Sequence, residues 1–301
     1  MPIPIADQTV SKVAAQGARE VAATQQSSKR VPSPSRSTTR KVTRLLRRLV
    51  VPALLFGAWI FVTRADIVAT IFLPPPSDLW DSFRALQDRL PSAIAQSVVM
   101  TLTGFLLGTL FGITLGLAMA YSRLARDLFG DLLDFVRPVP IFALIPLFVL
   151  WFGIGRTPQV VLIALGTSVI LGVTTIEAVK NIPLVYVRAA LTLGASRSQI
   201  YRTVLIPYIV PHLWGAIRVA AAASWGLDVA AEFIGAQNGL GYLMIVQQTY
   251  LDTAGLLLIV LIYSLLALTL DTLIRLAEKP ITRWTERSAS QGAVASIVGR
   301  A

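Results

Sequence analysis

The chain has 301 residues, of which 27 are Lys or Arg and 16 are Asp or Glu, giving a formal net charge of +11. Only 14% of the residues are charged and 54% are hydrophobic, against roughly 25% and 45–50% in ordinary soluble domains. With a mean hydropathy of +0.67, this composition indicates a membrane protein and not a nucleic-acid partner. Cysteine is absent and His212 is the one histidine, which excludes disulfides, thiol nucleophiles and metal sites built from thiolates or His pairs.

Residues 1–40 form a basic arm that we expect to be disordered. The first 48 residues hold ten Lys or Arg and only two acids, Asp7 and Glu20. The arm is rich in Ser, Thr, Gln, Arg and Pro, has no helical or strand periodicity, and offers little apolar material to bury. A cleaved signal peptide is the alternative, but the arm is too long for one and no small-residue cleavage site follows.

Six segments approach the length of a membrane-spanning helix, which needs about 20 mostly apolar residues to cross roughly 30 Å of hydrocarbon. They are Leu49–Thr63, Leu90–Ser122, Pro138–Gly155, Thr157–Ile176, Thr203–Ala231 and Thr253–Leu270. Every backbone group in lipid must be paired, which leaves helices and closed barrels as the possible structures. These segments are far too long and continuous for barrel strands, so they are expected to be helices. The predicted fold class is therefore an all-α membrane protein with six transmembrane helices.

These spans divide the chain into four parts. We expect the disordered arm at 1–40, the first transmembrane helix and an external connection at 41–89, a core with five further spans at 90–275, and a cytoplasmic tail at 276–301.

One face of the second span carries a glycine at every fourth position. The glycines are Gly104, Gly108, Gly112 and Gly116. Glycines at this spacing let another helix approach closely in lipid.

The Lys and Arg residues predict the orientation of the chain. With the N-terminus in the cytoplasm, 22 of them lie on the cytoplasmic side, four lie outside, and Arg218 lies within a span. Without the arm the ratio is still 12 to 4. Both termini are therefore expected in the cytoplasm, where the arm would attract anionic membrane lipids at about 1 kcal/mol per basic residue.

No catalytic constellation is evident in the sequence. A Gly-x-x-x-x-Gly-Lys loop for phosphates is absent, and an intramembrane serine protease would need a His near a span serine such as Ser168. We therefore expect neither an enzyme nor a metal site.

Residues 187–213, VRAALTLGASRSQIYRTVLIPYIVPHL, connect the fourth and fifth spans through a long cytoplasmic segment. Apolar residues recur at helical spacing on both sides of Gly194. This pattern predicts a short helix, a turn at Gly194 and a second helix, together a knuckle that projects into the cytoplasm. The alternative is a plain surface loop.

Part of this segment resembles a known signature. Ala189-Ala190-x-x-x-Gly194-Ala195, followed by Val204-x-Ile206-Pro207, is similar to the EAA motif of permease subunits in bacterial ABC importers, with Arg188 where that family has Glu. The resemblance implies that residues 183–207 form the coupling loop whose helix seats in a groove of the ATPase subunit.

Two further runs resemble the permeases of the nitrate, sulfonate, taurine and bicarbonate class. They are RPVPIFALIPLFVLWFGIG (137–155) and AAEFIGAQNGLGYLM (230–244), and they are most similar to taurine and aliphatic sulfonate permeases. The resemblance implies the MetI-like permease fold and ATP-driven import of a small organic anion, a sulfonate or taurine. Nitrate, bicarbonate or a heterocyclic vitamin precursor is the alternative within the class, and an ion-coupled secondary transporter is the alternative outside it.

The same resemblance implies a location and a set of partners. The location is a bacterial inner (plasma) membrane, crossed several times. The partners are a second permease copy, an ABC ATPase dimer inside, and a periplasmic or lipid-anchored solute-binding protein outside. No cofactor is expected in this chain, because ATP would be bound by the ATPase subunit.

Three prolines and one arginine are candidates for the translocation path. Pro138, Pro140 and Pro146 would bend the third span, as in the broken helices of transporters, or would simply kink a packing helix. Arg218 lies about 16 Å from Pro207 along the fifth span, near mid-membrane depth, where a cation needs a partner or water.

Arg218 would either attract an anionic substrate or form a structural ion pair. The expected partners for such a pair are Asp134, Glu177, Asp228 and Glu232. A position closer to the cytoplasmic surface is the third possibility.

The outer end of the fifth span carries two acids that share a helix face, Asp228 and Glu232. They would repel an anion, so we expect them to dock a partner protein or pair with Arg218. With Gly239 and Gly241 in the following turn, Glu232 forms a candidate outer gate or binding-protein contact. Trp225 is expected to be an interfacial anchor.

Overall fold

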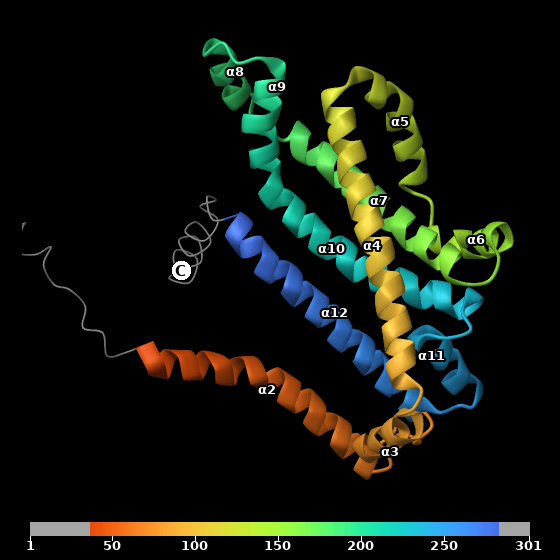
Figure 1. Cartoon of the computed structure of the whole chain (residues 1–301). Helices are drawn as coiled ribbons and strands as arrows, with labels where there is room; N and C mark the ends of the chain where they lie inside the picture. The colour runs from red at the N-terminus through yellow and green to blue at the C-terminus, as the bar shows by residue number, and fades with distance from the viewer. Residues whose placement is uncertain (1–36, 283–301) are drawn as a thin grey trace, which may run out of the picture. The chain divides into compact units, whose positions relative to one another are not determined.

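The computed structural model describes residues 37–282, and every regular element in that range is a helix (Figure 1). Residues 1–36 of the predicted arm and residues 283–301 of the predicted tail lie outside the described residues. The chain divides into two units between Val62 and Thr63, and each is described by itself.

A single helix, α2 (Ser37–Arg64), accounts for the described part of the first unit and continues to Arg64. Residues 37–40, expected to be disordered, are therefore helical. The apolar part of α2, Val50–Arg64, agrees with the expected first span but is shorter than the other candidate spans. That it spans a membrane stays a prediction.

Four helices of the second unit are long and apolar enough to cross a membrane. They are α4 (Leu90–Tyr121), α7 (Arg156–Lys180), the continuous helix Arg197–Ile234 and α12 (Thr253–Ile281). They confirm the second, fourth, fifth and sixth expected spans as helices. Helix α12 runs eleven residues beyond the predicted end at Leu270, because an Asp271–Arg275 ion pair and good helix formers extend it past the apolar stretch.

The third expected span, Pro138–Gly155, is not one straight helix. It consists of a short 3₁₀ turn, η1 (Ile141–Leu144), and α6 (Ile145–Phe152), which are bent by 93° from the preceding helix α5 (Arg123–Val136). Pro138 and Pro140 lie in the break, where each lacks a backbone donor and disfavours helix in the residue before it. The bent pair would make a fifth span, and α2 is the candidate for the sixth.

The remaining elements lie at the two ends of the second unit (Figure 1). Helices α8 (Leu184–Thr192) and α9 (Arg197–Ile200) are at one end, which we call the knuckle end. Helices α3 (Pro76–Leu86) and α11 (Leu240–Thr249) are at the opposite end, which we call the α11 end. Helix α10 (Ile206–Gly235) runs between the two.

Helices α4 and α7 are packed through the predicted glycine face. A Cβ atom added to Gly108 would lie 2.5 Å from the Ala164 carbonyl oxygen, and one added to Gly112 would lie 2.5 Å from that of Ser168. Backbone lies against backbone here, so no larger side chain fits. The glycine face is confirmed, and α7 is the helix that approaches it.

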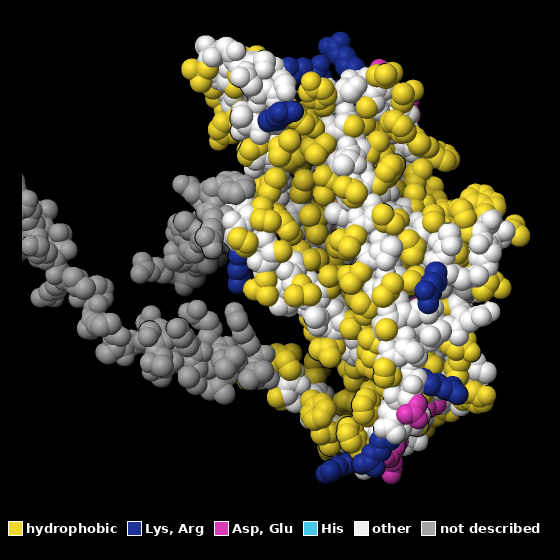
Figure 2. All heavy atoms as spheres, in the orientation of Figure 1, with side chains coloured by type: hydrophobic (Ala, Val, Ile, Leu, Met, Phe, Trp, Pro, Cys, Tyr) yellow, Lys and Arg dark blue, Asp and Glu magenta, His cyan; other side chains and the backbone are white. Residues whose placement is uncertain are grey.

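The visible face of the second unit is covered mostly by hydrophobic side chains, with acids gathered at the α11 end (Figure 2). Polar side chains nevertheless occur in the interior, among them Ser97, Thr101, Asp228 and Glu232, all at most 1% exposed. Trp225 is also buried and packs edge-to-face on Tyr263, with ring centroids 6.0 Å apart. The expectation that Trp225 is an interfacial anchor is therefore wrong.

Substitution Gly112→Ala is expected to lower the stability of the second unit. The added methyl must push α4 away from the α7 backbone, and overpacking of this kind costs about 1–3 kcal/mol. The measurement is the melting temperature of the purified protein in detergent. Gly226→Ala in α10, where a Cβ meets nothing within 4 Å, is the control, and an equal loss there would contradict the packing explanation.

Candidate functional site

The knuckle, residues 184–205, is built as the sequence predicts, from a helix, a turn and a second helix. Helix α8 ends at Thr192, and two residues later Gly194 has a left-handed φ of +77°. The Ala195 N–H donates to the Ala190 carbonyl at 3.0 Å, and the Gly194 N–H donates to that of Leu191 at 2.9 Å. These two bonds form a Schellman motif, which favours glycine at this position.

The tip of the knuckle exposes apolar side chains. Leu193 is 88% exposed, and Leu184, Val185 and Leu191 are also exposed. Among the predicted motif residues, Arg188 and Ala189 are exposed as well, and Arg188 makes no ion pair with any other described residue. Such a tip can meet an apolar groove in a partner.

The knuckle joins α10 through a π-helical turn, η2 (Tyr201–Leu205). Ser196 caps α9 with a capping box that includes Gln199, so the second helix has a defined start. Val204, Ile206 and Pro207 are half-buried at the junction, and Pro207 lies in the first turn of α10. A π turn inside a helix is a frequent feature of functional sites.

At the α11 end, the Glu232 carboxylate holds the start of α11. It accepts hydrogen bonds from the Gly241 N–H at 2.6 Å and from the Ser97 hydroxyl at 2.8 Å. Ser97 in turn accepts from the Leu240 N–H at 2.9 Å. Negative charge is favourable at a helix N-terminus, so this arrangement fixes α11 to α4 and α10.

Gly239 and Gly241 are required by the same contacts. A Cβ atom on Gly239 would collide with the Glu232 carboxylate, and Gly239 has a φ of +122°. On Gly241 the added atom would lie 2.8 Å from the Glu232 Cβ. All three predicted gate residues are thus brought together in the interior of the second unit, where they are buried. A role as outer gate or binding-protein contact stays a prediction.

Tyr263 of α12 links the two buried acids. Its hydroxyl lies 3.2 Å from Glu232 Oε2 and 3.3 Å from Asp228 Oδ2, and it can donate to one of them at a time. Asp228 Oδ1 and the Thr101 hydroxyl have no hydrogen-bond partner among the described residues. We call Ser97, Asp228, Glu232, Gly241 and Tyr263 the carboxylate latch.

Arg218 forms an ion pair, but with none of the four expected partners. Its Nε lies 2.6 Å from Asp271 Oδ1 and its Nη2 lies 3.3 Å from Asp271 Oδ2. Arg275 also contacts Asp271, at 2.8 Å, so the three residues carry one excess positive charge. The pair is about 24 Å from Ile234 along α10 and about 27 Å from Thr253 along α12, within both long helices and not at the end of either.

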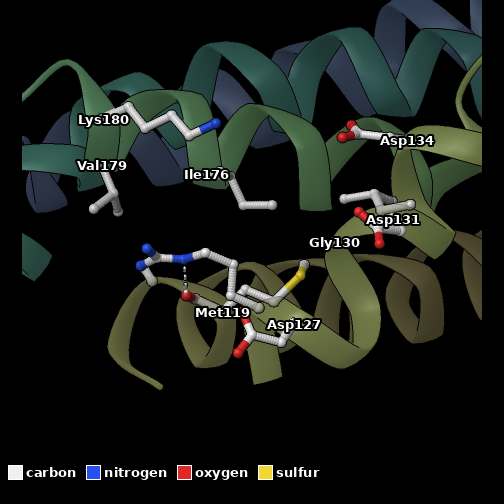
Figure 3. A pocket seen from close by; sticks show the side chains of 11 residues that line it. Met119, Asp127, Gly130, Asp131, Asp134, Ile176, Val179 and Lys180 are labelled. Carbon is white, nitrogen blue, oxygen red and sulfur yellow. Dashed lines mark hydrogen bonds between the residues drawn. The ribbon is translucent and has the colours of Figure 1, made fainter. Parts of the chain in front are cut away.

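A cavity of about 490 Å³ lies between α4, α5 and α7 toward the knuckle end (Figure 3). Asp127, Asp131 and Asp134 of α5 face it, as does Lys180 of α7. Arg126 lines it too and donates from its Nε to the Met119 carbonyl at 3.2 Å. With more acids than bases, this cavity is poorly suited to an organic anion.

The predicted path residues do not line that cavity. Pro138, Pro140 and Pro146 are exposed on the second unit, and Arg218 is engaged with Asp271. The structure therefore brings the motif residues and the gate residues together, but not the path residues.

Ser97, Tyr263 and Asp271 are members of these contacts that the sequence did not identify. Ser97 and Tyr263 are polar residues in apolar spans, and Asp271 is the first acid after the sixth span. A polar residue within a span was the available signal, since such residues seek partners inside the bundle.

Residues 108–283 match the family model described as "Binding-protein-dependent transport system inner membrane component". The taurine transport system permease protein TauC of Escherichia coli (strain K12) is 31% identical over 239 residues, which cover 77% of this chain and 87% of that protein. The putative aliphatic sulfonates transport permease protein SsuC of the same organism is 30% identical, with 77% and 89% covered.

Solved structures show the same fold. A chain of the MetNI methionine ABC transporter in an inward-facing conformation is 22% identical, with a TM-score of 0.53, over 66% of this chain and 97% of that one. A chain of a bacterial ABC transporter that imports alginate is 17% identical, with a TM-score of 0.54, over 80% of this chain and 97% of that one. The MetI-like permease fold is thereby confirmed.

Substitution Glu232→Gln is expected to loosen α11. The amide offers one acceptor oxygen, so either the Ser97 hydroxyl or the Gly241 N–H loses its carboxylate partner, at about 1.5–3 kcal/mol. Amide hydrogen exchange across Leu240–Thr249 is expected to become faster. Glu278→Gln, a change at a partly exposed residue of α12, is the control. Protection of α11 in Glu232→Gln equal to that of the unchanged protein would refute the latch.

Proposed function

Because the chain belongs to the family of binding-protein-dependent transport system inner membrane components, we propose that it is one half of a two-fold permease pair in an ATP-driven importer. The chain is an ABC transporter permease, a multi-pass inner-membrane protein and not an enzyme. Permeases of this family hold no cofactor themselves, and ATP is used by a partner ATPase.

The knuckle is the observation that carries the proposal. Its Schellman turn presents a preformed helix with an exposed apolar tip at Leu193, outside the long apolar helices. A preformed helix with an apolar tip suits a groove on a second protein, because the helix is already ordered and little conformational freedom is lost on docking. We assign that groove to the ATPase subunit, which puts the knuckle end in the cytoplasm and the α11 end outside.

The mechanism follows from this arrangement. Closure of the ATPase subunits on binding ATP would move the knuckle, and α10 continues directly from it. Tilting of α10 and its neighbours would convert an inward-open path into an outward-open one. The α11 segment, held by the carboxylate latch, would then serve as the outer gate at which a binding protein releases its solute.

We propose a small organic anion, taurine or another sulfonate, as the solute. The relatives named for taurine and aliphatic sulfonates support this class. A relative named for riboflavin transport, RibX of Chloroflexus aurantiacus, supports the heterocyclic alternative. The ligand of the binding protein that works with this permease distinguishes them in a direct binding measurement.

Substitution Leu193→Asp is expected to abolish co-purification with the ATPase subunit. Removal of a central apolar anchor typically costs about 2 kcal/mol or more, and a buried unpaired carboxylate adds to that. Gln248→Asp, which adds the same charge at the α11 end, is the control and should leave the complex intact.

Association unaffected by Leu193→Asp would contradict docking through the knuckle. Uptake that persists in ATP-depleted cells with an intact membrane potential would refute the importer and favour ion-coupled transport.

Substitution Arg218→Gln separates the two proposed roles of this arginine. The two-contact pair with Asp271 favours a structural brace between α10 and α12, so we expect lower thermal stability. The apparent KM for a sulfonate should remain within about twofold, well below the tenfold that 1.4 kcal/mol of lost anion attraction would produce. Transport by reconstituted complexes, measured against taurine concentration, checks this. A large rise in KM at unchanged stability would place Arg218 in the anion path.

A further inference from the structure

Four contacts connect the knuckle to the last turn of α4. The Arg197 guanidinium donates from Nη2 to the Tyr121 carbonyl, and its Cζ lies 4.8 Å from the centre of the Tyr121 ring. The Tyr201 hydroxyl donates to the Leu117 carbonyl at 2.7 Å. The Tyr121 and Tyr201 rings meet edge-to-face, with centroids 5.0 Å apart. We call these four residues the Tyr121 cluster.

The chemistry of a helix end explains the position of Arg197. The last carbonyls of α4 lack the amide donors of a following turn, and the negative end of the helix dipole favours a cation there. Tyr121 is the final residue of α4, so Arg197 supplies both the missing donor and the positive charge. The cluster is therefore a specific cap on α4 provided by the knuckle.

Outside the cluster, the knuckle packs on the long helices through apolar side chains such as Val187 and Leu205. No residue of α8 is fully buried, and Leu184, Val185, Tyr186 and Leu191 are exposed. At the root of the knuckle, the π turn η2 replaces regular helix. Next to this turn, the Tyr121 cluster joins the knuckle to α4 through polar contacts of defined direction.

Helix α4 does not move freely, because its glycine face lies against the backbone of α7. We infer that Arg197 and Tyr201 are positioning residues that make the knuckle and the end of α4 move together, so that displacement of the knuckle shifts the α4–α7 pair along with α10. This inference rests on the proposed function, in which the ATPase displaces the knuckle.

The test compares cluster variants with matched controls in the reconstituted complex with ATPase and loaded binding protein. Tyr201→Phe removes the hydroxyl bond and keeps the ring, and Arg197→Gln removes the charge. The controls are Tyr208→Phe in α10 and Arg123→Gln in α5, which alter the same residue types at exposed or partly exposed places outside the knuckle, where neither polar group forms a hydrogen bond within the described chain.

Each cluster variant is expected to bind the ATPase normally and to hydrolyse ATP, yet to transport less solute per ATP. A fall of about fivefold is expected for Tyr201→Phe, the factor that one neutral hydrogen bond is worth. A larger fall is expected for Arg197→Gln, and both controls should keep the ratio of the unchanged protein.

The outcomes separate this inference from the proposed function. If the unchanged permease fails to bind an ATPase, the proposed function is wrong. If it binds and transports, but both cluster variants keep the normal ratio of transport to ATP hydrolysis, the inference is overturned. Reduced assembly with a normal ratio also overturns it, because a merely structural cluster would give that result.

Discussion

The close approach of α4 to α7 is the constraint on which the rest of the second unit depends. At Gly108 and Gly112 the two backbones meet without side chains between them, so dispersion contacts hold the pair where water cannot drive association. The other helices pack against this pair. Helix α5 contacts it through Leu133, and Ala216 and Ala220 of α10 pack on Leu171 of α7. Both the knuckle and the carboxylate latch contact the α4–α7 pair through α4.

Local chemistry explains why the knuckle could be predicted. The turn depends on one residue that tolerates a positive φ, and Gly194 is that residue, with apolar residues at helical spacing on both sides of it. The glycine face was equally readable, because a period of four places the glycines on one side of a helix. The sequence predicted that prolines bend the third span, and the bend lies at Pro138 and Pro140. A count of apolar residues could not show that α5 belongs to the same bent element.

Pairings between distant segments were not predictable in the same way. Several acids were available to pair with Arg218, and Asp271 was missed because it follows the predicted end of the sixth span at Leu270. The burial of Glu232 was missed for a related reason: its partners, Ser97 and Tyr263, come from two other helices. Sequence shows that a polar group in a span needs a partner, and only the packed structure shows which one it has.

Helix α4 is engaged at both ends, by Ser97 in the latch and by Tyr121 beside the knuckle, and these residues are about 36 Å apart along its axis. If displacement of one end of α4 changes the contacts at its other end, the knuckle and the latch are thermodynamically linked. Linkage is reciprocal. The free energy by which nucleotide binding changes the α11 segment therefore equals the free energy by which a change at the α11 segment alters nucleotide binding. A loaded binding protein would then be an allosteric ligand of the ATPase, acting through a single helix.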